Sequence, residues 1–260
     1  MNLFYIDIEK VQFFLLIFFR IIAIFIIVPV FGDRATPSLL KAGFAAAISF
    51  IIFPIVSTNI HHSLNIHNIY ELTVLIVKEL ALGLSTGFII RLIFAGIDFA
   101  AQIAGFQMGF GIVNVFDPHF EEQMSIIAKF QNIFAVLIFL AINAHHYIIK
   151  AITESFEIIP PAGINFSGKI TAFMITVSSE IFTLAIKISA PVVATLLISN
   201  IIFGILVRTV PQINIFIVTF PLLIGIGLVV LGISMPYIYQ IFKSSFTEMD
   251  IKMLRLLRLF

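Results

Sequence analysis

The sequence contains no cysteine and no tryptophan, and only 11% of its 260 residues are charged. Without cysteine, disulfides, thiolate metal sites and thiol nucleophiles are excluded. The net charge is only +1, which argues against a nucleic-acid partner, because phosphate binding needs a basic surface. Without tryptophan, an aromatic belt at a membrane surface has to come from tyrosine and phenylalanine.

What the chain has in excess is apolar surface. Hydrophobic residues make up 60% of the sequence, and the mean hydropathy is +1.14. A soluble domain has about 45–50% apolar and about 25% charged residues. A single core cannot bury such an excess in a chain of this length, so we predict an all-α, polytopic membrane protein.

Six apolar runs are long enough to form helices. They cover roughly these residues: 11–31, 39–57, 69–104, 126–149, 172–207 and 214–242. A spanning helix needs about 20 residues at 1.5 Å each, which fits four of the runs. The runs at 69–104 and 172–207 have about 35 residues, so they must tilt strongly, break or extend well beyond the hydrocarbon.

Polar turns separate the runs, and proline marks several of them, at Pro37, Pro118, Pro160 and Pro211. Proline disfavours helix in the residue before it. We predict one membrane-embedded domain over residues 1–242, followed by an amphipathic basic tail over 243–260. The tail suits a helix on an anionic membrane surface, and a frayed end with incidental charge is an equal alternative.

Charged residues interrupt the apolar runs. A charge at the centre of a spanning helix costs at least about 2.5–3.5 kcal/mol, so it usually faces protein or water and has a partner. Arg91 and Asp98 are seven residues apart and share a helix face, but they lie about 10 Å apart along the axis. Partners are therefore expected from neighbouring helices or subunits, whereas Glu71 suits a membrane edge. We predict these buried intramembrane charges: Lys78, Glu79, Arg91, Asp98, Glu180 and Lys187.

The most unusual segment runs from Gly105 to Pro118, where three glycines alternate with Phe, Met and Gln. Each glycine destabilises a helix by about 1 kcal/mol relative to alanine, so the segment is poised to leave the helix. Non-helical backbone at membrane depth is tolerated only where protein or a water-filled cavity covers it. Flexible backbone bearing Phe and Met suits a compressible plug, and a glycine-rich helix-packing surface is equally consistent with the pattern.

Several stretches together resemble the FliR family of type III protein export, which serves flagella and has a counterpart in virulence injectisomes. They are Gly87–Pro118, Ala141–Lys150, Phe156–Gly163 and Ala190–Leu231, with the early Pro29-Val30-Phe31-Gly32. The order and spacing agree over most of the chain. The sequence departs from the usual pattern at Ala144 and Thr219, where glycine is common, and at Leu223, where lysine is common. The last change removes an intramembrane charge.

The resemblance implies a non-enzymatic structural and gating subunit of the flagellar export apparatus, with several spans in the bacterial inner (cell) membrane, in the flagellar basal body. Family members assemble with FliP and FliQ and are contacted by FlhB. Their long, broken helical hairpins stack into a hetero-oligomeric helical assembly around a channel for unfolded export substrates. The family's channel plug matches these residues: Gly105, Phe106, Gln107, Met108, Gly109, Phe110, Gly111, Phe116, Asp117 and Pro118. A second family motif implies a partner-contact turn, although its residues alone would also suit an ordinary hairpin loop: Arg208, Pro211, Gln212 and Asn214.

Two other classes of protein remain open. Broken helices and intramembrane charges also occur in secondary transporters of ions or small solutes, although the two halves of the chain show no inverted similarity. An intramembrane enzyme would need a catalytic or metal motif, and HExxH does not occur. The letters GxSxG occur at Gly83–Gly87, but inside a long apolar run and not at the strand-to-helix turn that this motif requires. His145 and His146 are adjacent and point about 100° apart on a helix, so we expect neither a metal nor a cofactor.

Overall fold

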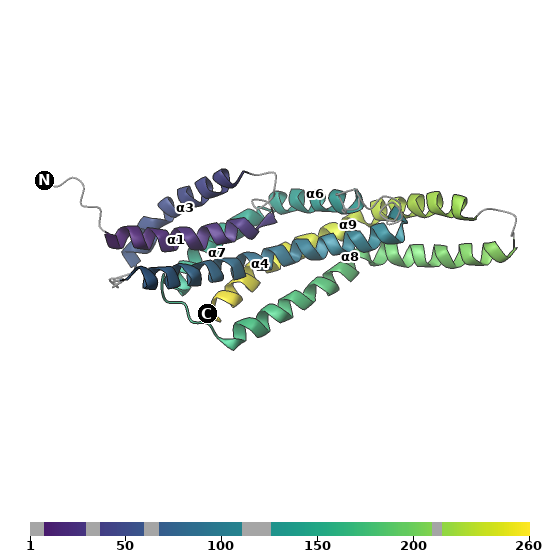
Figure 1. Ribbon diagram of the computed structural model, residues 1–260. Helices are drawn as coiled ribbons and strands as arrows, with labels where there is room; N and C mark the ends of the chain where they lie inside the picture. Colours follow the sequence, from purple (N-terminus) through teal and green to yellow (C-terminus); the bar gives the residue numbers. More distant parts are fainter. Residues whose placement is uncertain (1–7, 30–36, 60–67, 111–125, 210–214) are drawn as a thin grey trace. The chain divides into compact units, whose positions relative to one another are not determined.

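The computed structural model describes residues 8–29, 37–59, 68–110, 126–209 and 215–260, and within these ranges it contains helices and no strand. The helices are α1 (Ile8–Ile27), α3 (Ser38–Asn59), α4 (Ile69–Gln107), α6 (Ile126–Ala141), α7 (Ala144–Ile158), α8 (Gly168–Thr209) and α9 (Ile215–Leu257) (Figure 1). Five of the described helices are long and apolar enough to cross a membrane, or six spans if α6 and α7 count as one bent span. The all-α, polytopic membrane fold predicted from the sequence is confirmed.

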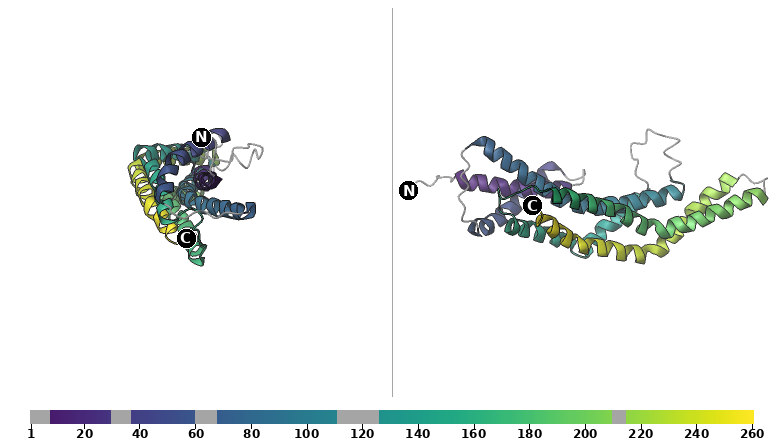
Figure 2. Two further views of the ribbon diagram at one scale, coloured as in Figure 1. Left: turned by 90° about the vertical axis from the view of Figure 1, so that its left-hand side faces the viewer. Right: turned by 90° about the horizontal axis from the view of Figure 1, so that it is seen from below.

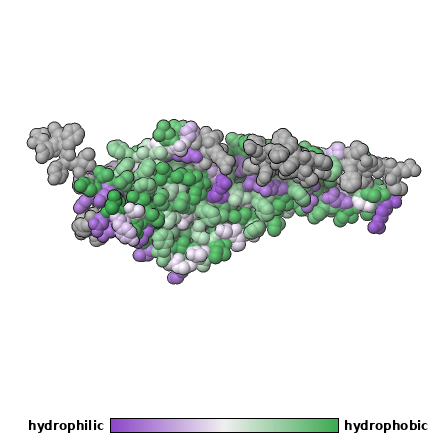
Figure 3. Space-filling model, in the orientation of Figure 1, coloured by the Kyte–Doolittle hydropathy of each residue, from purple (hydrophilic) through white to green (hydrophobic). Residues whose placement is uncertain are grey.

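Three helices are far longer than a membrane span. α4 has 39 residues, α8 has 42 and α9 has 43. At 1.5 Å per residue, α4 is about 58 Å long, nearly twice the hydrocarbon thickness of about 30 Å. The long runs predicted at 69–104 and 172–207 therefore do not break, which leaves strong tilt or extension beyond the hydrocarbon. Apolar side chains cover much of the visible described surface (Figure 3).

The chain folds into two compact units, and α4, α8 and α9 contribute residues to both. Unit 1 comprises the described parts of Met1–Leu92, Asn143–Val177 and Thr247–Phe260. Here α1 packs beside α3 (Figures 1 and 2), and the rings of Phe13 and Phe53 meet edge to face with centroids 6.0 Å apart. The end of α9 closes a core in which Leu257 packs with these residues: Leu82, Ile159 and Ile164.

Unit 2 comprises the described parts of Ile93–Ile142 and Ser178–Phe246. Its core contains three aromatic rings from α4, α6 and α9, with centroids 5.3–6.0 Å apart: Phe94, Phe139 and Phe246. α4 also approaches α8 closely, because a Cβ built on Gly96 would lie 2.9 Å from Leu184 Cδ2. In this unit α8 and the first part of α9 run antiparallel (Figure 2).

The structure differs from the predicted layout at residues 126–149. This run fits one span by length, but α6 ends at Ala141 and α7 begins at Ala144. Asn143 has a φ of 56°, in the left-handed region that Asn adopts more readily than most residues because its side chain can hydrogen-bond locally. The chain therefore bends inside a continuous apolar run.

The predicted boundary at residue 243 does not coincide with a helix end. α9 continues to Leu257, and Met249, Met253 and Leu256 are fully buried. Their three- and four-residue spacing keeps one apolar face of α9 against unit 1. Among the basic residues, Arg255 places its guanidinium 5.4 Å from the centre of the Phe173 ring. The described tail is packed helix and not a frayed end.

Candidate functional sites

A buried ion pair lies inside unit 1. Arg20 on α1 donates its Nε–H to Oε2 of Glu79 on α4 over 2.6 Å, and both side chains are fully buried. Glu79 is one of the predicted intramembrane charges, and its partner lies on a neighbouring helix. Sequence reasoning did not find this pair, because the two residues are 59 positions apart and no local pattern links them.

Arg20 also caps the end of α7. Its Nη1 donates to the carbonyl oxygens of Ser155 at 2.8 Å and Ile159 at 2.9 Å. The Ser155 carbonyl also accepts the backbone N–H of Ile159 over 3.0 Å. A buried cation beside the carbonyls at the end of a helix is favourable, because they form the negative end of the helix dipole. The guanidinium carbon also lies 4.2 Å from the centre of the Phe156 ring, a favourable cation–π distance.

Glu79 extends the same network to the turn that follows α7. Its Oε1 accepts the backbone N–H of Ala162 over 3.1 Å, and Ala162 has a φ of 71°. The turn closes through a hydrogen bond from Gly163 N–H to the Pro160 carbonyl over 2.9 Å. The ion pair therefore joins α1, α4, the end of α7 and the turn leading to α8.

Two glycines of α4 explain why Arg20 and Glu79 can meet. A Cβ on Gly83 would lie 2.5 Å from the Arg20 carbonyl oxygen and 2.7 Å from the Ala23 Cβ. A Cβ on Gly87 would lie 3.1 Å from the carbonyl oxygen of Ile24. Small residues four positions apart let helices approach closely in membranes, and Glu79 lies one turn before this contact.

A second candidate site lies in unit 2, where α4 ends. α4 ends at Gln107, and Gly109 follows with a φ of +93°. Its N–H donates to the Phe106 carbonyl over 3.0 Å. Glycine in the left-handed region is a common helix terminator. The α-helix therefore ends within the glycine-rich segment, whose residues from Gly111 to Pro118 lie outside the described residues.

The described plug candidates divide by their surroundings. Met108 is fully buried against α9, since a Cβ on Gly227 would lie 2.6 Å from Met108 Cγ. A Cβ on Gly109 would lie 3.0 Å from Phe220 Cδ1. Phe106, by contrast, is 74% exposed. Gly105 is buried, and Gln107 and Phe110 are half-buried. The remaining candidates lie outside the described residues: Gly111, Phe116, Asp117 and Pro118.

The other predicted charges occupy varied positions. Asp98 is half-buried and accepts hydrogen bonds from Gln102 Nε2 at 2.9 Å and Asn132 Nδ2 at 3.2 Å. Lys78 is half-buried, and its Nζ donates to the Ile164 carbonyl at 3.5 Å. Three charges are exposed on the single chain: Arg91, Glu180 and Lys187. Their burial by other chains stays a prediction.

The predicted partner-contact turn is described only at its first residue. Arg208, in the last turn of α8, is exposed. Pro211, Gln212 and Asn214 lie outside the described residues.

The histidine pair lies at the start of α7. The rings of His145 and His146 have centroids 4.3 Å apart. Within the described ranges, no group of three or more His, Asp or Glu side chains is arranged to hold a metal ion.

The helices and their buried charges define a multi-pass, all-α membrane protein. The family described as "Bacterial export proteins, family 1" matches residues 11–249. The chain is similar to the "Flagellar biosynthetic protein FliR" of Bacillus subtilis (strain 168), with 37% identity over 90% of both chains. The protein of that name from Aquifex aeolicus (strain VF5) is 30% identical over 90% of this chain and 89% of the relative. The protein of that name from Escherichia coli (strain K12) is 28% identical over 88% of this chain and 86% of the relative.

The chain therefore belongs to the FliR family of bacterial export proteins. It is a membrane component of the flagellar export apparatus.

Proposed function

We propose that the protein is a structural and gating subunit of the flagellar type III export channel in the bacterial inner membrane. In this proposal it assembles with FliP and FliQ, is contacted by FlhB, and lets unfolded export substrates pass through the shared channel. The segment from Gly105 to Pro118 contributes to the plug that seals the channel at rest.

The observation that carries this proposal is the way α4 ends. Met108 is inserted against Gly227 of α9 while the backbone turns at Gly109. Phe106, two residues before Met108, is 74% exposed, so most of its ring faces away from the chain. Met108 thus anchors the start of the segment, and Phe106 offers an apolar surface to the facing part of the channel. A seal against water needs both features, because an apolar constriction excludes ions only if it is held in place.

The exposed charges support a subunit that other proteins or an aqueous channel cover. Arg91, Glu180 and Lys187 are exposed on helices that are candidate membrane spans. Each would cost at least about 2.5–3.5 kcal/mol at the centre of a lipid bilayer. Contact with partner subunits or with water in a channel removes this cost.

Deleting residues 106–116 tests the plug assignment. We expect the assembled complex to form and to leak ions across the membrane at rest, because the deletion removes both the exposed Phe106 and the Met108 anchor. Ion flux is measured in vesicles containing the purified complex, with the complex carrying the unsubstituted chain as the control. A complex that forms normally and stays sealed after the deletion contradicts the assignment.

A further inference from the structure

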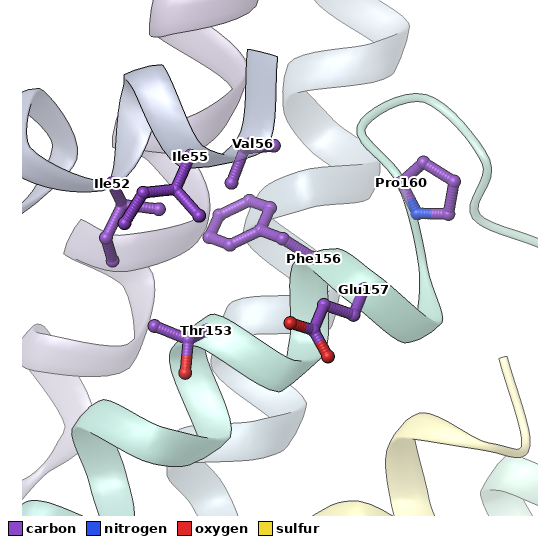
Figure 4. A pocket seen from close by; sticks show the side chains of 7 residues that line it. All are labelled: Ile52, Ile55, Val56, Thr153, Phe156, Glu157 and Pro160. Carbon is purple, nitrogen blue, oxygen red and sulfur yellow. The ribbon is translucent and has the colours of Figure 1, made fainter. Parts of the chain in front are cut away.

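A recess of about 250 Å³ opens on unit 1 between α3 and α7 (Figure 4). Apolar side chains from both helices form most of its lining, and one carboxylate joins them: Ile52, Ile55, Val56, Thr153, Phe156 and Glu157. Pro160, just after the end of α7, completes the lining. The recess lies outside the plug segment and is not explained by the proposed function.

The polar character of the recess comes from one negative charge. Thr153 already donates its hydroxyl to the Lys150 carbonyl over 2.8 Å, so it has no donor left for a ligand. The Glu157 carboxylate is exposed. It makes no hydrogen bond or ion pair with the residues that the structure describes. A ligand that suits this lining combines an apolar part with a single cation.

The recess also lies where two helices end. The candidate span of α3 closes at Ser57, and Ile52, Ile55 and Val56 belong to its last two turns. α7 ends at Ile158, the residue after Glu157. α3 has the length of a single span, and a helix of that length ends near the zone where hydrocarbon gives way to polar headgroups.

We propose that this recess binds a phospholipid with an ammonium headgroup, such as phosphatidylethanolamine. The ammonium group pairs with Glu157, and the upper part of one acyl chain lies along the exposed Ile55, above the largely buried Ile52, Val56 and Phe156. A volume of about 250 Å³ equals that of about eight waters, which is enough for part of an acyl chain. A side chain from a partner subunit is the other occupant of this size, and the experiment below distinguishes the two.

The absence of tryptophan from the sequence gives a direct test. Ile55 is 56% exposed at the rim, so Ile55→Trp places a fluorescent reporter there without overpacking. The assembled complex is reconstituted in lipid nanodiscs that contain brominated phosphatidylethanolamine or brominated phosphatidylglycerol, because bromine quenches tryptophan on contact. The complex with the unsubstituted chain supplies the background from other subunits.

We expect phosphatidylethanolamine to be preferred over phosphatidylglycerol by about two- to fivefold in apparent association, the range of a partly exposed ion pair. Glu157→Gln removes this preference. Glu154→Gln keeps it, because Glu154 lies on the same helix but pairs with Lys150 outside the recess. A reporter at Phe50→Trp, on a 76% exposed position of α3, shows no preference between the two lipids.

Three results overturn the proposal. Equal quenching of the residue-55 reporter by both lipids shows that the recess does not select a headgroup. A preference that survives Glu157→Gln shows that Glu157 does not bind the headgroup. A reporter at residue 55 that neither lipid quenches, while the one at residue 50 is quenched, shows that another subunit fills the recess. If Glu157→Gln prevents assembly, Thr153→Met narrows the recess with the charge intact and should reduce quenching by phosphatidylethanolamine.

Discussion

Replacing Arg20 with methionine tests the central packing of unit 1. The change leaves the fully buried Glu79 carboxylate without its cation, and the carbonyls of Ser155 and Ile159 lose a donor. Removing one partner of a buried ion pair costs about 3–5 kcal/mol, a large part of a typical total stability of about 5–15 kcal/mol. For a chain of this size, 1 kcal/mol shifts the melting temperature by about 2–4 °C. We therefore expect Arg20→Met to lower the melting temperature by about 6–20 °C.

The matched control is Lys150→Met, which breaks the Lys150–Asp250 pair. That pair spans 3.1 Å, but Lys150 is 51% exposed, so solvent screens it and we expect little change in the melting temperature. The assay heats the detergent-extracted complex with this chain fluorescently tagged and measures the surviving complex by size exclusion.

A double variant separates the pair from its two members. In the double variant Arg20→Met with Glu79→Met, no charge stays buried alone. Its loss of unfolding free energy should therefore be smaller than the sum of the two single losses by about 2–3 kcal/mol. If Arg20→Met melts within the range of the Lys150 control, or if the two single losses simply add, the pair does not hold unit 1 as described.

Three further substitutions follow from close contacts and backbone angles. Gly227→Ala should displace Met108, whose Cγ would lie 2.6 Å from the new Cβ, and make the channel leak ions, whereas Gly225→Ala meets nothing within 4 Å and should stay sealed in the same flux assay. Gly83→Ala should cost about 1–3 kcal/mol by overpacking, because its Cβ would meet the Arg20 backbone, and Gly43→Ala on the open face of α3 should not lower the melting temperature. Asn143→Ala should be less stable than Asn143→Gly by about 1–2 kcal/mol in the free energy of unfolding, and so melt at a lower temperature, since residue 143 has a φ of 56°. An equal effect within any of these pairs would contradict the contact or angle behind it.

The sequence predicts the class of fold and several helix ends. Apolar excess is a property of the whole chain, so it identifies a helical membrane protein without knowledge of any contact. Helix ends at Pro37, Pro160 and Gly109 follow from local stereochemistry: α3 begins at Ser38, α7 ends at Ile158 and α4 ends at Gln107. Proline and glycine act on their immediate neighbours, so a short window of sequence contains the whole cause.

The contacts that build the candidate sites are not local. Gly83 and Gly87 form a small-residue pair that is visible in the sequence, but nothing in it identifies α1 as the helix that they approach. The same holds for Met108, whose buried position depends on Gly227 of a different helix. The bend at Asn143 lies within an apolar run, where the periodicity continues on both sides and hides the change of direction.

The central claim is that this chain works as a subunit of an export channel and not alone. The most direct test is to tag the chain at its native expression level, purify it in mild detergent and measure the intact mass of the particle. We predict one stable complex that contains FliP and FliQ together with this chain, and poor recovery of the chain when it is expressed without them. A well-behaved monomer that purifies free of both partners would contradict the account.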